Sequence, residues 1–321
     1  MSRFVIVGLA CLAGAMCARA QVIMFVSEYG TGNLRGYDFS GPSGTPVGLP
    51  PAYTPVGGVG TGADGMVTDT AGRLYVNRGD GTIYRRSLDG MTFSIFASIG
   101  VPDLLDLTRD ATHLYAARYG HPTLYRVSLA DASWTVLPGP TGLDTSDGVR
   151  IGPDGRLYAV DSTDGQIFAY DLSTATWATF LSGPPTPGIA SQVEFGADGR
   201  VFLSRTVGSD ARVYSFTLNT PGVWSSGLNP SSETLIGSLG AGSATGIRIG
   251  PDGRLYANNF AAGEVWRSDV GITSMQSSPY VTGVSYPGSI FFAPIPEPGA
   301  AALLLMAAGG FALAARRGRL G

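Results

Sequence analysis

Two aspartates, Asp64 and Asp147, are the residues whose type and position best suit chemistry. Each is followed by Gly and a short apolar strand, at the same place in two similar stretches. A hard cation such as Ca²⁺ takes six to eight oxygen ligands, so two carboxylates could begin a calcium site together with carbonyls and water. Asp side chains also bond nearby backbone, and both could instead cap the turn that enters the strand. The sequence leaves these two interpretations open.

Histidine adds little to this set. His113 and His121 are the two histidines of the chain and lie in one repeat, which excludes a histidine-rich metal site and a dispersed acid–base set. His121 lies in a loop and could face the same opening as the aspartates or be a solvated loop residue. The sequence also has no serine-hydrolase elbow, zinc-protease helix or phosphate-binding loop. The candidate ligands are therefore Asp64, Asp147 and His121.

Repeats would position these side chains. Residues 148–159 and 246–257 are identical except for Ile247 in place of Val149. Looser copies surround them, and one aromatic position recurs at spacings of 40, 43, 44 and 54 residues. The aligned aromatic residues are Tyr75, Tyr115, Tyr158, Phe202 and Tyr256. Each copy contains an apolar strand, a turn that often holds Asp-Gly, the aromatic strand, a third strand and usually a fourth. This is the pattern of a propeller blade.

The two ends of the repeat array complement each other. Residues 23–26 and 34–39 resemble the second and third strands of a unit that lacks its first, and residues 289–293 resemble a first strand alone. Joining them completes a sixth blade and leaves no blade unpaired. We therefore expect an all-β, six-bladed β-propeller over residues 21–294, closed by pairing of the N- and C-terminal strands. Five complete blades with two disordered ends are the alternative.

Residues 1–20 predict a signal peptide with a helical apolar core. Arg3 precedes an apolar run, and the small residues Ala18 and Ala20 fit cleavage by signal peptidase before Gln21. A lipoprotein modified at Cys17 is the alternative. Both cysteines of the chain lie in this segment, so the mature protein would need no disulfide.

Residues 295–321 predict a sorting signal. The triplet Pro296, Glu297 and Pro298 is followed by the uncharged residues 300–315. As a helix these would span about 24 Å of the ~30 Å hydrocarbon core. The arginine cluster that follows would stay cytoplasmic and consists of Arg316, Arg317 and Arg319.

In this order the features of the tail resemble a PEP-CTERM signal. That resemblance implies export by a Gram-negative bacterium that makes exopolysaccharide, a short transmembrane helix that anchors the chain transiently in the inner membrane, and processing by an exosortase near the triplet. A retained membrane anchor is the alternative. After processing, the protein would lie at the cell surface or outside the cell.

Charge argues against nucleic-acid binding. Outside the two targeting ends the chain has 16 arginines, and all 24 acidic residues lie between residues 28 and 297, so this span has a formal charge of −8. The arginines are scattered, whereas nucleic-acid binding needs clustered cations that face phosphates. Nucleic acid is therefore not expected as a partner.

The repeats resemble six-bladed propellers of the gluconolactonase and regucalcin group and the NHL-type propellers near it. Residues 64–76 and 147–162 carry the resemblance as motif, and most of residues 22–294 carry it as architecture. In the lactonase members, an Asp or Asn at the mouth of the inner strands holds a divalent metal together with a Glu of another blade. The resemblance places at this mouth Asp64, Leu104, Asp147, Ser191 and Thr245. Where the Glu would stand the chain reads Tyr-Pro-Gly, at residues 286–288.

Two functions from different classes follow from these observations. We expect an exported, non-catalytic propeller that binds glycan or matrix protein, because the mouth is mostly neutral and lacks the Glu. The alternative is a metal-dependent hydrolase or lyase of the lactonase type that uses the central opening, with Asp64 and Asp147 as ligands. A divalent cation such as Ca²⁺ is the one cofactor that the sequence suggests.

Overall fold

The computed structural model describes residues 21–41, 43–47, 62–87 and 93–295. The signal peptide expected over residues 1–20 and the sorting motif from Pro296 to Arg319 lie outside these residues. Contacts divide the chain into Met24–Phe292, which forms the body of the fold, and a second unit of Met1–Ile23 and Ala293–Gly321. Within the described residues, no helix is long and apolar enough to cross a membrane.

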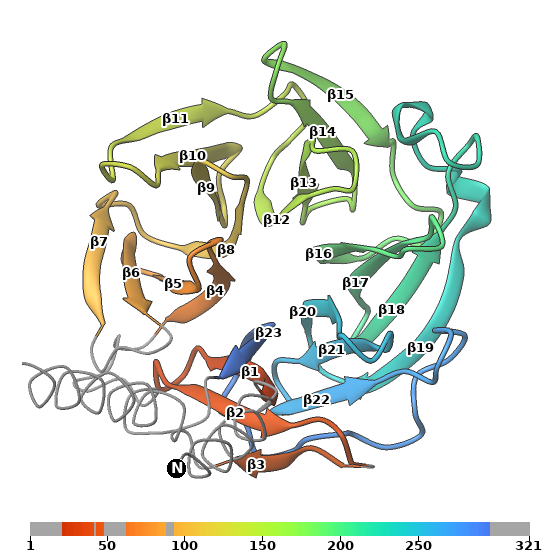
Figure 1. Ribbon diagram of the computed structural model, residues 1–321. Helices are drawn as coiled ribbons and strands as arrows, with labels where there is room; N and C mark the ends of the chain where they lie inside the picture. Colours follow the sequence, from red (N-terminus) through yellow and green to blue (C-terminus); the bar gives the residue numbers. More distant parts are fainter. Residues whose placement is uncertain (1–20, 42, 48–61, 88–92, 296–321) are drawn as a thin grey trace, which may run out of the picture. The chain divides into compact units, whose positions relative to one another are not determined.

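Six small antiparallel sheets surround a central axis as the blades of a propeller (Figure 1). Blade I consists of β23 (Pro287–Ile295), β1 (Gln21–Glu28), β2 (Leu34–Asp38) and β3 (Thr45–Val47). Blade II consists of β4 (Ala63–Thr68), β5 (Arg73–Arg78), β6 (Thr82–Ser87) and β7 (Ser94–Ser98). Blade III consists of β8 (Leu104–Arg109), β9 (His113–Arg118), β10 (Thr123–Ser128) and β11 (Trp134–Pro138).

The second half of the ring repeats this order from the inner strand outward. Blade IV consists of β12 (Ser146–Ile151), β13 (Leu157–Asp161), β14 (Ile167–Asp171) and β15 (Thr176–Leu181). Blade V consists of β16 (Ile189–Phe195), β17 (Val201–Val207), β18 (Asp210–Phe216) and β19 (Thr234–Ala241). Blade VI consists of β20 (Ala244–Ile249), β21 (Leu255–Asn259) and β22 (Glu264–Arg267). Between β18 and β19 lie two 3₁₀ turns, η1 (Trp224–Ser226) and η2 (Pro230–Ser232).

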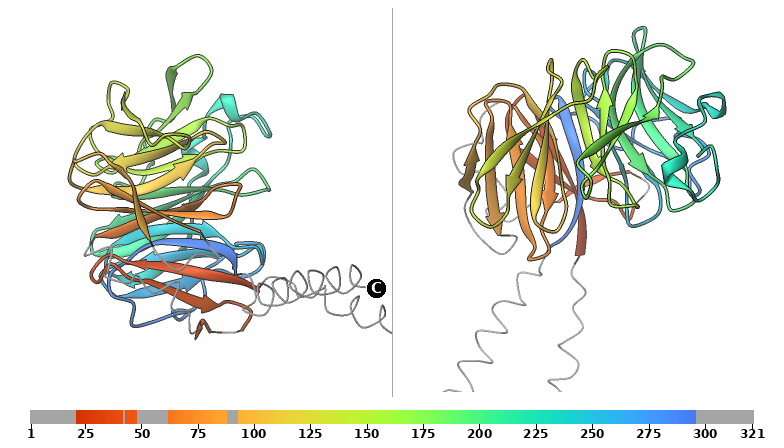
Figure 2. Two further views of the ribbon diagram at one scale, coloured as in Figure 1. Left: turned by 60° about the vertical axis from the view of Figure 1, so that its left-hand side comes forward. Right: turned by 90° about the horizontal axis from the view of Figure 1, so that it is seen from above.

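The ring closes through blade I. β23 lies beside β1, so strands from opposite ends of the repeat array share one sheet (Figures 1 and 2). The Ser289 N–H donates a hydrogen bond of 2.8 Å to the Ser27 hydroxyl, across 262 residues of sequence. The prediction of an all-β, six-bladed propeller closed by its terminal strands is confirmed, and the five-blade alternative is wrong.

Blade VI has three named strands, although its outer edge is partly covered. After β22 the chain returns along that edge, where Val265 and Val281 form an isolated bridge. The Val265 N–H donates to the Val281 carbonyl at 2.9 Å, and the Tyr280 N–H donates to the Val265 carbonyl at 2.8 Å. This irregular return supplies the cover that a fourth strand gives the other blades.

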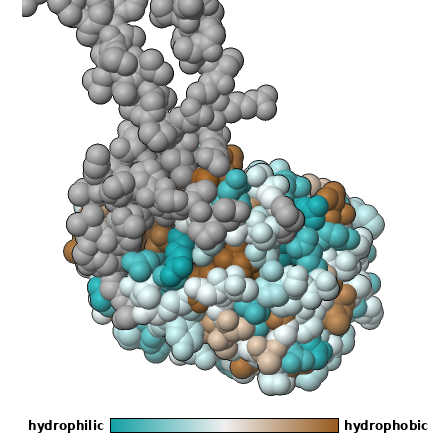
Figure 3. All heavy atoms as spheres, turned by 90° about the horizontal axis from the view of Figure 1, so that it is seen from below, coloured by the Kyte–Doolittle hydropathy of each residue, from teal (hydrophilic) through white to brown (hydrophobic). Residues whose placement is uncertain are grey.

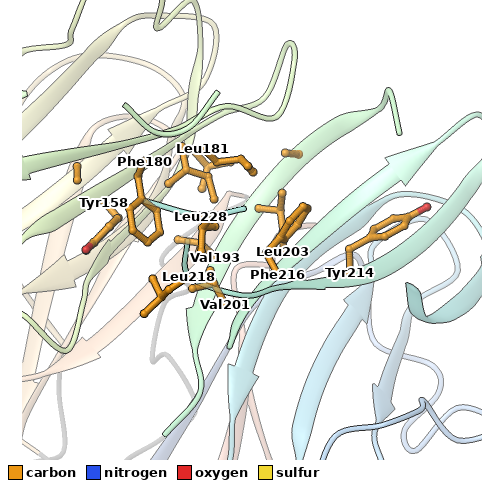
Figure 4. Close-up of a cluster of buried hydrophobic side chains, with 14 residues drawn as sticks. Tyr158, Phe180, Leu181, Val193, Val201, Leu203, Tyr214, Phe216, Leu218 and Leu228 are labelled. Atoms are coloured by element: carbon orange, nitrogen blue, oxygen red, sulfur yellow. The ribbon is translucent and has the colours of Figure 1, made fainter. Parts of the chain in front are cut away.

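Packing between neighbouring blades forms the core. Figure 4 shows the cluster between blades IV and V, where Tyr158 and Phe180 meet Val193 and Leu203. The Tyr158 ring lies 4.7 Å from the centroids of both Phe180 and Phe195. The recurring aromatic residue therefore joins one blade to the next.

On the surface seen in Figure 3, the hydrophobic residues are interspersed with hydrophilic and neutral ones.

The same aromatic residue also fastens the turn that precedes it. The Tyr158 hydroxyl donates to Asp154 at 3.0 Å, and Tyr256 makes the same bond to Asp252 at 2.8 Å. The Arg156 guanidinium approaches the Tyr158 hydroxyl at 2.9 Å. The repeated Asp-Gly-Arg-Leu-Tyr sequence is therefore one hydrogen-bonded unit, and this explains why it is copied between blades.

We expect Tyr158→Phe to lower the free energy of unfolding by about 1–3 kcal/mol, because it removes two partly buried hydrogen bonds, to Asp154 and from Arg156, and leaves the ring in place. Chemical denaturation measures the change. Tyr125→Phe, in a strand outside this motif, is the matched control. Equal stability of Tyr158→Phe and the unaltered protein would show that the hydroxyl does not hold the turn.

Candidate functional site

A cavity of about 360 Å³ opens where the inner strands begin. All six blades contribute one residue from this level of the ring. In blade order these residues are Gly288, Asp64, Leu105, Asp147, Ser191 and Thr245. The volume lies within the range of small-molecule sites, and the position on the axis of the propeller makes it the candidate site.

β-bulges aim these side chains into the cavity. The pairing register of the inner strand with its neighbour shifts near its start in blades II to VI, between Ala63 and Met66 in blade II and between Ser146 and Gly148 in blade IV. A bulge inserts unpaired residues and turns their side chains out of the regular alternation. Asp64 and Asp147 occupy such positions, so one local device presents both carboxylates to the same space.

Glycine allows the inner strands to approach each other at the next level. A Cβ at Gly65 would lie 2.3 Å from the Leu107 amide nitrogen, and a Cβ at Gly148 would lie 2.2 Å from the Ser191 carbonyl oxygen. In blades III and V, the residue at the position equivalent to Gly65 and Gly148 is polar, and its side chain accepts a hydrogen bond from the next blade. Asp106 accepts a hydrogen bond from the Val149 N–H at 3.0 Å, and Gln192 accepts one from the Ile247 N–H at 3.2 Å.

Three carboxyl groups influence one another in and below the cavity. Burial raises the pKa of Asp64 well above its ordinary value, and the charges of Asp106 and Asp147 add to the rise. Burial raises the pKa of Asp147 to about 7. A hydrogen bond with Ser191 opposes this rise, and the charge of Asp106 adds to it. Burial therefore favours the protonated form of both carboxyls, and Asp147 changes its protonation state near neutral pH.

A buried ionic column continues beneath these carboxyls. Burial raises the pKa of Asp106 to about 6, although the charge of Arg248 and the N–H groups of Val149 and Leu107 oppose the rise. Burial lowers the pKa of Arg248 to about 10. Arg248 also lies 3.5 Å from Glu194, which forms a second ion pair with Arg150. The charge of Arg248 compensates Asp106, whereas the two buried carboxyls at the cavity wall, Asp64 and Asp147, lie above the column.

The structure brings together two of the three predicted site residues. Asp64 and Asp147 both line the cavity, whereas His121 is exposed and is not among the lining residues. The His121 backbone carbonyl accepts a hydrogen bond from the Ser146 N–H at 3.0 Å, so this loop supports the start of β12. Leu104 was expected at the mouth but is fully buried in the hydrophobic core, and Leu105 lines the cavity instead because of the bulge in β8.

Several residues of the site were missed by the sequence reasoning. The sequence predicts an apolar strand over residues 105–107 and assigns no role to Asp106. An acidic residue within an apolar strand was the signal that could have indicated a buried carboxyl. Arg150 and Arg248 stand at equivalent positions of the two nearly identical repeats, a sign that a buried charge was copied with them. Asp103, Tyr119 and Phe260 also line the cavity and come from loops without a repeat signature.

The described side chains fit a divalent metal poorly. No group of three or more His, Cys, Asp or Glu among them is arranged to hold a metal ion. Gly288 stands where the closing blade would supply a carboxylate, and a Cβ there would lie 2.6 Å from the Asp64 Oδ1 atom. Asp106 is occupied by the N–H groups of Val149 and Leu107. The calcium site suggested by the sequence therefore keeps Asp64 and Asp147 as its carboxylates and gains none from the closing blade.

The raised pKa of Asp147 predicts a pH-dependent stability. In the unfolded chain this carboxyl ionises near pH 3.8, whereas in the folded protein it keeps its proton up to about pH 7. The folded state therefore loses stability relative to the unfolded state as pH rises between these values. We expect the melting temperature of Asp147→Asn, relative to the unaltered protein, to rise from pH 4 to pH 7 and then level off. Differential scanning calorimetry in EDTA measures the two melting temperatures, and a difference between them that does not change with pH would contradict the prediction.

The fold defines a six-bladed β-propeller, and an acidic cavity opens at the mouth of its inner strands. No family model matches the chain. The chain is similar to the pentonolactonase XacC of Haloferax volcanii, with 22% identity over 156 residues that cover 45% of this chain and 53% of that protein. The chain thus spans about half the length of the curated relative that it matches.

Solved structures share the architecture. The nidogen/laminin complex matches with a TM-score of 0.64 and 13% identity, over 85% of this chain and 98% of that one. A Bacteroides fragilis protein named for 6-phosphogluconolactonase activity matches with a TM-score of 0.55 and 12% identity, over 85% of this chain and 98% of that one. A protein named for gluconolactonase activity matches with a TM-score of 0.57 and 15% identity, over 73% of this chain and 85% of that one. The resemblance to gluconolactonase-type propellers is therefore confirmed for the fold.

These comparisons correct the expected function. The prediction of a non-catalytic binding module is wrong, because the curated relative is a lactonase and two similar structures are named for lactonases, which favours the alternative. The prediction rested on a mouth that was counted as mostly neutral. The structure adds Asp103 to the cavity wall and Asp106 beneath it, so the site is more acidic than the repeat alignment indicated.

Proposed function

We propose that the protein hydrolyses a small lactone in the central cavity. The observation that carries this proposal is the pair of carboxyls in one cavity, Asp64 and Asp147, whose pKa values are both raised by burial, that of Asp147 to about 7. Such a pair supplies a general acid and a general base at the same time. The similarity to a pentonolactonase supports the choice of ester chemistry on a sugar-derived ring.

In the proposed reaction, Asp147 is the base and Asp64 is the acid. A water molecule attacks the lactone carbonyl carbon and transfers a proton to the Asp147 carboxylate. The bond between that carbon and the ring oxygen then breaks, and Asp64 donates its proton to the leaving oxygen. The product is an open-chain hydroxy acid, and exchange of protons with solvent restores both carboxyls.

Gln192 is the residue best suited to hold the lactone carbonyl. It lines the cavity, and its side-chain oxygen accepts a hydrogen bond from the Ile247 N–H. This bond fixes the orientation of the amide and leaves its NH₂ group as the donor that it can offer to a carbonyl oxygen. A donor placed in advance stabilises the negative charge that develops on that oxygen as water attacks.

The test is hydrolysis of a panel of pentono-1,4-lactones and hexono-1,5-lactones by the purified full chain, followed by proton release. One series contains EDTA, and three others contain Ca²⁺, Zn²⁺ or Mn²⁺. We expect hydrolysis above the spontaneous rate in EDTA. No acceleration of any lactone in any series would overturn the function, whereas acceleration that requires a metal would overturn only the roles given to the two carboxyls.

We also propose that the chain is exported, with signal peptidase and an exosortase-type enzyme as processing partners and the inner membrane as a transient anchor. The order of features in residues 1–20 and 295–321 supports this. Mass spectrometry of the protein from its native cells should find an N-terminus at Gln21 and a C-terminus near the triplet at residues 296–298. A tail that is intact to Gly321 would instead indicate a retained anchor.

A further inference from the structure

Asp103, which lines the cavity, and Tyr286, whose ring contacts the lining residue Phe260, have a left-handed backbone conformation. Asp103 has φ 65° and Tyr286 has φ 53°, and each directly precedes the inner strand of its blade. Gly62, with φ 100°, stands at the same place before β4. The left-handed region is therefore required at this position in three blades, and Gly is the residue that adopts it without steric cost. An Asp and a Tyr that are kept there point to a role for their side chains.

The Tyr286 ring belongs to a row of three aromatic rings. It lies 5.1 Å from the Phe260 centroid, and Phe260 lies 5.8 Å from Tyr29. Phe260 and Tyr29 line the cavity, and the Tyr286 side chain is 51% exposed. A Cβ at Gly30 would lie 2.7 Å from the Tyr286 ring, so this glycine leaves room for the ring. The row extends from the wall of the cavity to the surface.

Asp103 stands with another exposed ring on blade III, across the propeller from blade VI and its Phe260 (Figure 1). The Tyr119 N–H donates to the Asp103 carbonyl at 2.9 Å, and both residues are exposed and line the cavity. A carboxylate beside an aromatic ring can accept hydrogen bonds from hydroxyls while the ring covers an apolar face of the same ligand. The mouth thus has rings on two opposite sides, and on one side the exposed carboxylate of Asp103 can accept hydrogen bonds from hydroxyls.

We propose that this rim binds a neutral sugar ring attached to the lactone, so that the substrate is a glycosyl-lactone rather than a free aldonolactone. The inference rests on the proposed function for its reaction but on the rim for its substrate. Three aspartates line the cavity, and among the described residues that line it there is no Arg, Lys or His. A phosphorylated or carboxylated substrate would therefore meet like charges, whereas a ring with hydroxyls and C–H faces suits the acceptors and the aromatic rings.

Kinetics on paired substrates test the proposal. Glucono-1,5-lactone is compared with cellobiono-1,5-lactone, maltobiono-1,5-lactone and 6-phosphoglucono-1,5-lactone. We expect kcat/KM to be at least about tenfold higher for one of the disaccharide lactones than for glucono-1,5-lactone, and lowest for the phosphorylated substrate. Equal values for the monosaccharide and both disaccharide lactones, or a preference for the phosphorylated one, would overturn the proposal.

Tyr286→Gly separates a substrate role from a structural one, because Gly removes the ring and suits the left-handed backbone. We expect it to abolish the disaccharide preference, to leave kcat/KM for glucono-1,5-lactone within about twofold, and to leave the melting temperature unchanged or raised. Tyr286→Phe should retain the preference. Trp134→Ala, which removes another exposed ring on the outer strand β11, should change neither value. A fall of the melting temperature with equal losses on both substrates would show that Tyr286 is structural.

A binding measurement keeps this test independent of hydrolysis. If no lactone is hydrolysed, the reduced sugars cellobiitol and maltitol still probe the rim by saturation-transfer NMR. We expect transfer from the full chain to one of them, and its loss in Tyr286→Gly. No transfer to either sugar would overturn the rim as a sugar subsite, and so would competition by choline at lower concentration, because that result would assign the rings and aspartates to a cationic ligand.

Discussion

Asp147→Asn should lower kcat/KM for lactone hydrolysis by about 100-fold or more, the usual effect of removing a general base. The substitution preserves the size of the side chain and replaces the carboxylate with a neutral amide that cannot accept the proton of water. Because the pKa of Asp147 is raised to about 7, the activity of the unaltered protein should increase with pH up to about that value and then level off. In Asp147→Asn the remaining activity should lose this inflection. Initial rates from pH 5 to pH 8.5, corrected for spontaneous hydrolysis, measure both effects.

The matched control is Asp164→Asn in the same blade. Asp164 is exposed in the turn before β14, where its carboxylate accepts a hydrogen bond from the Gln166 N–H at 3.0 Å. This variant should keep at least half of the activity and the same pH profile. If Asp147→Asn retains the full rate with an unchanged profile while folding normally, Asp147 is not the base and the mechanism fails.

Ile290→Asp should lower the melting temperature by about 10 °C or more, because it places a charge in the core of the closing blade. Ile290 is fully buried in β23 and belongs to a cluster with Val26 and Tyr256. A carboxylate there loses its water and gains no partner, and the cluster loses the contacts between blades I and VI. Differential scanning calorimetry of the purified variants measures the change.

The same chemical change at an exposed strand position provides the control. Ile95 in β7 is 62% exposed, so Ile95→Asp should alter the free energy of unfolding by no more than about 0.5 kcal/mol. Similar melting temperatures for the two variants would mean that β23 does not hold the ring closed. Ile290→Val, which removes one methylene group, should cost about 0.5–1.5 kcal/mol and gives the scale of packing alone.

Much of the fold could be predicted because the chain repeats itself. Each copy carries the turn chemistry of its own hairpin, in which Asp154 or Asp252 bonds the Tyr of the next strand. The two incomplete copies at the ends predicted closure, because an unpaired inner strand and a blade without one satisfy each other. The sequence indicates a fourth strand in most copies but not in the one that forms blade VI. The irregular segment around Val281 that covers that edge could not be predicted, because its backbone bonds need no sequence motif.

The candidate site was predictable only in part. Asp64 and Asp147 were found because they hold equivalent positions in two repeats, and the shared bulge then brings them to one cavity. The exchange of Leu104 for Leu105 could not be foreseen, since a shift of one residue in a strand reverses the direction of the side chain. The rim residues Tyr286 and Asp103 carry no repeat signature, and their left-handed backbone becomes visible only in three dimensions.

By itself, the sequence determined the architecture of this protein: the number of blades, the order of strands within a blade and the pairing of the two ends follow from local patterns that recur along one chain. The tertiary structure decided the chemistry. The pKa of Asp147 depends on burial and on Asp106, a residue of another blade. Proximity between groups 40 or more residues apart sets such values, and it exists only after the ring has closed.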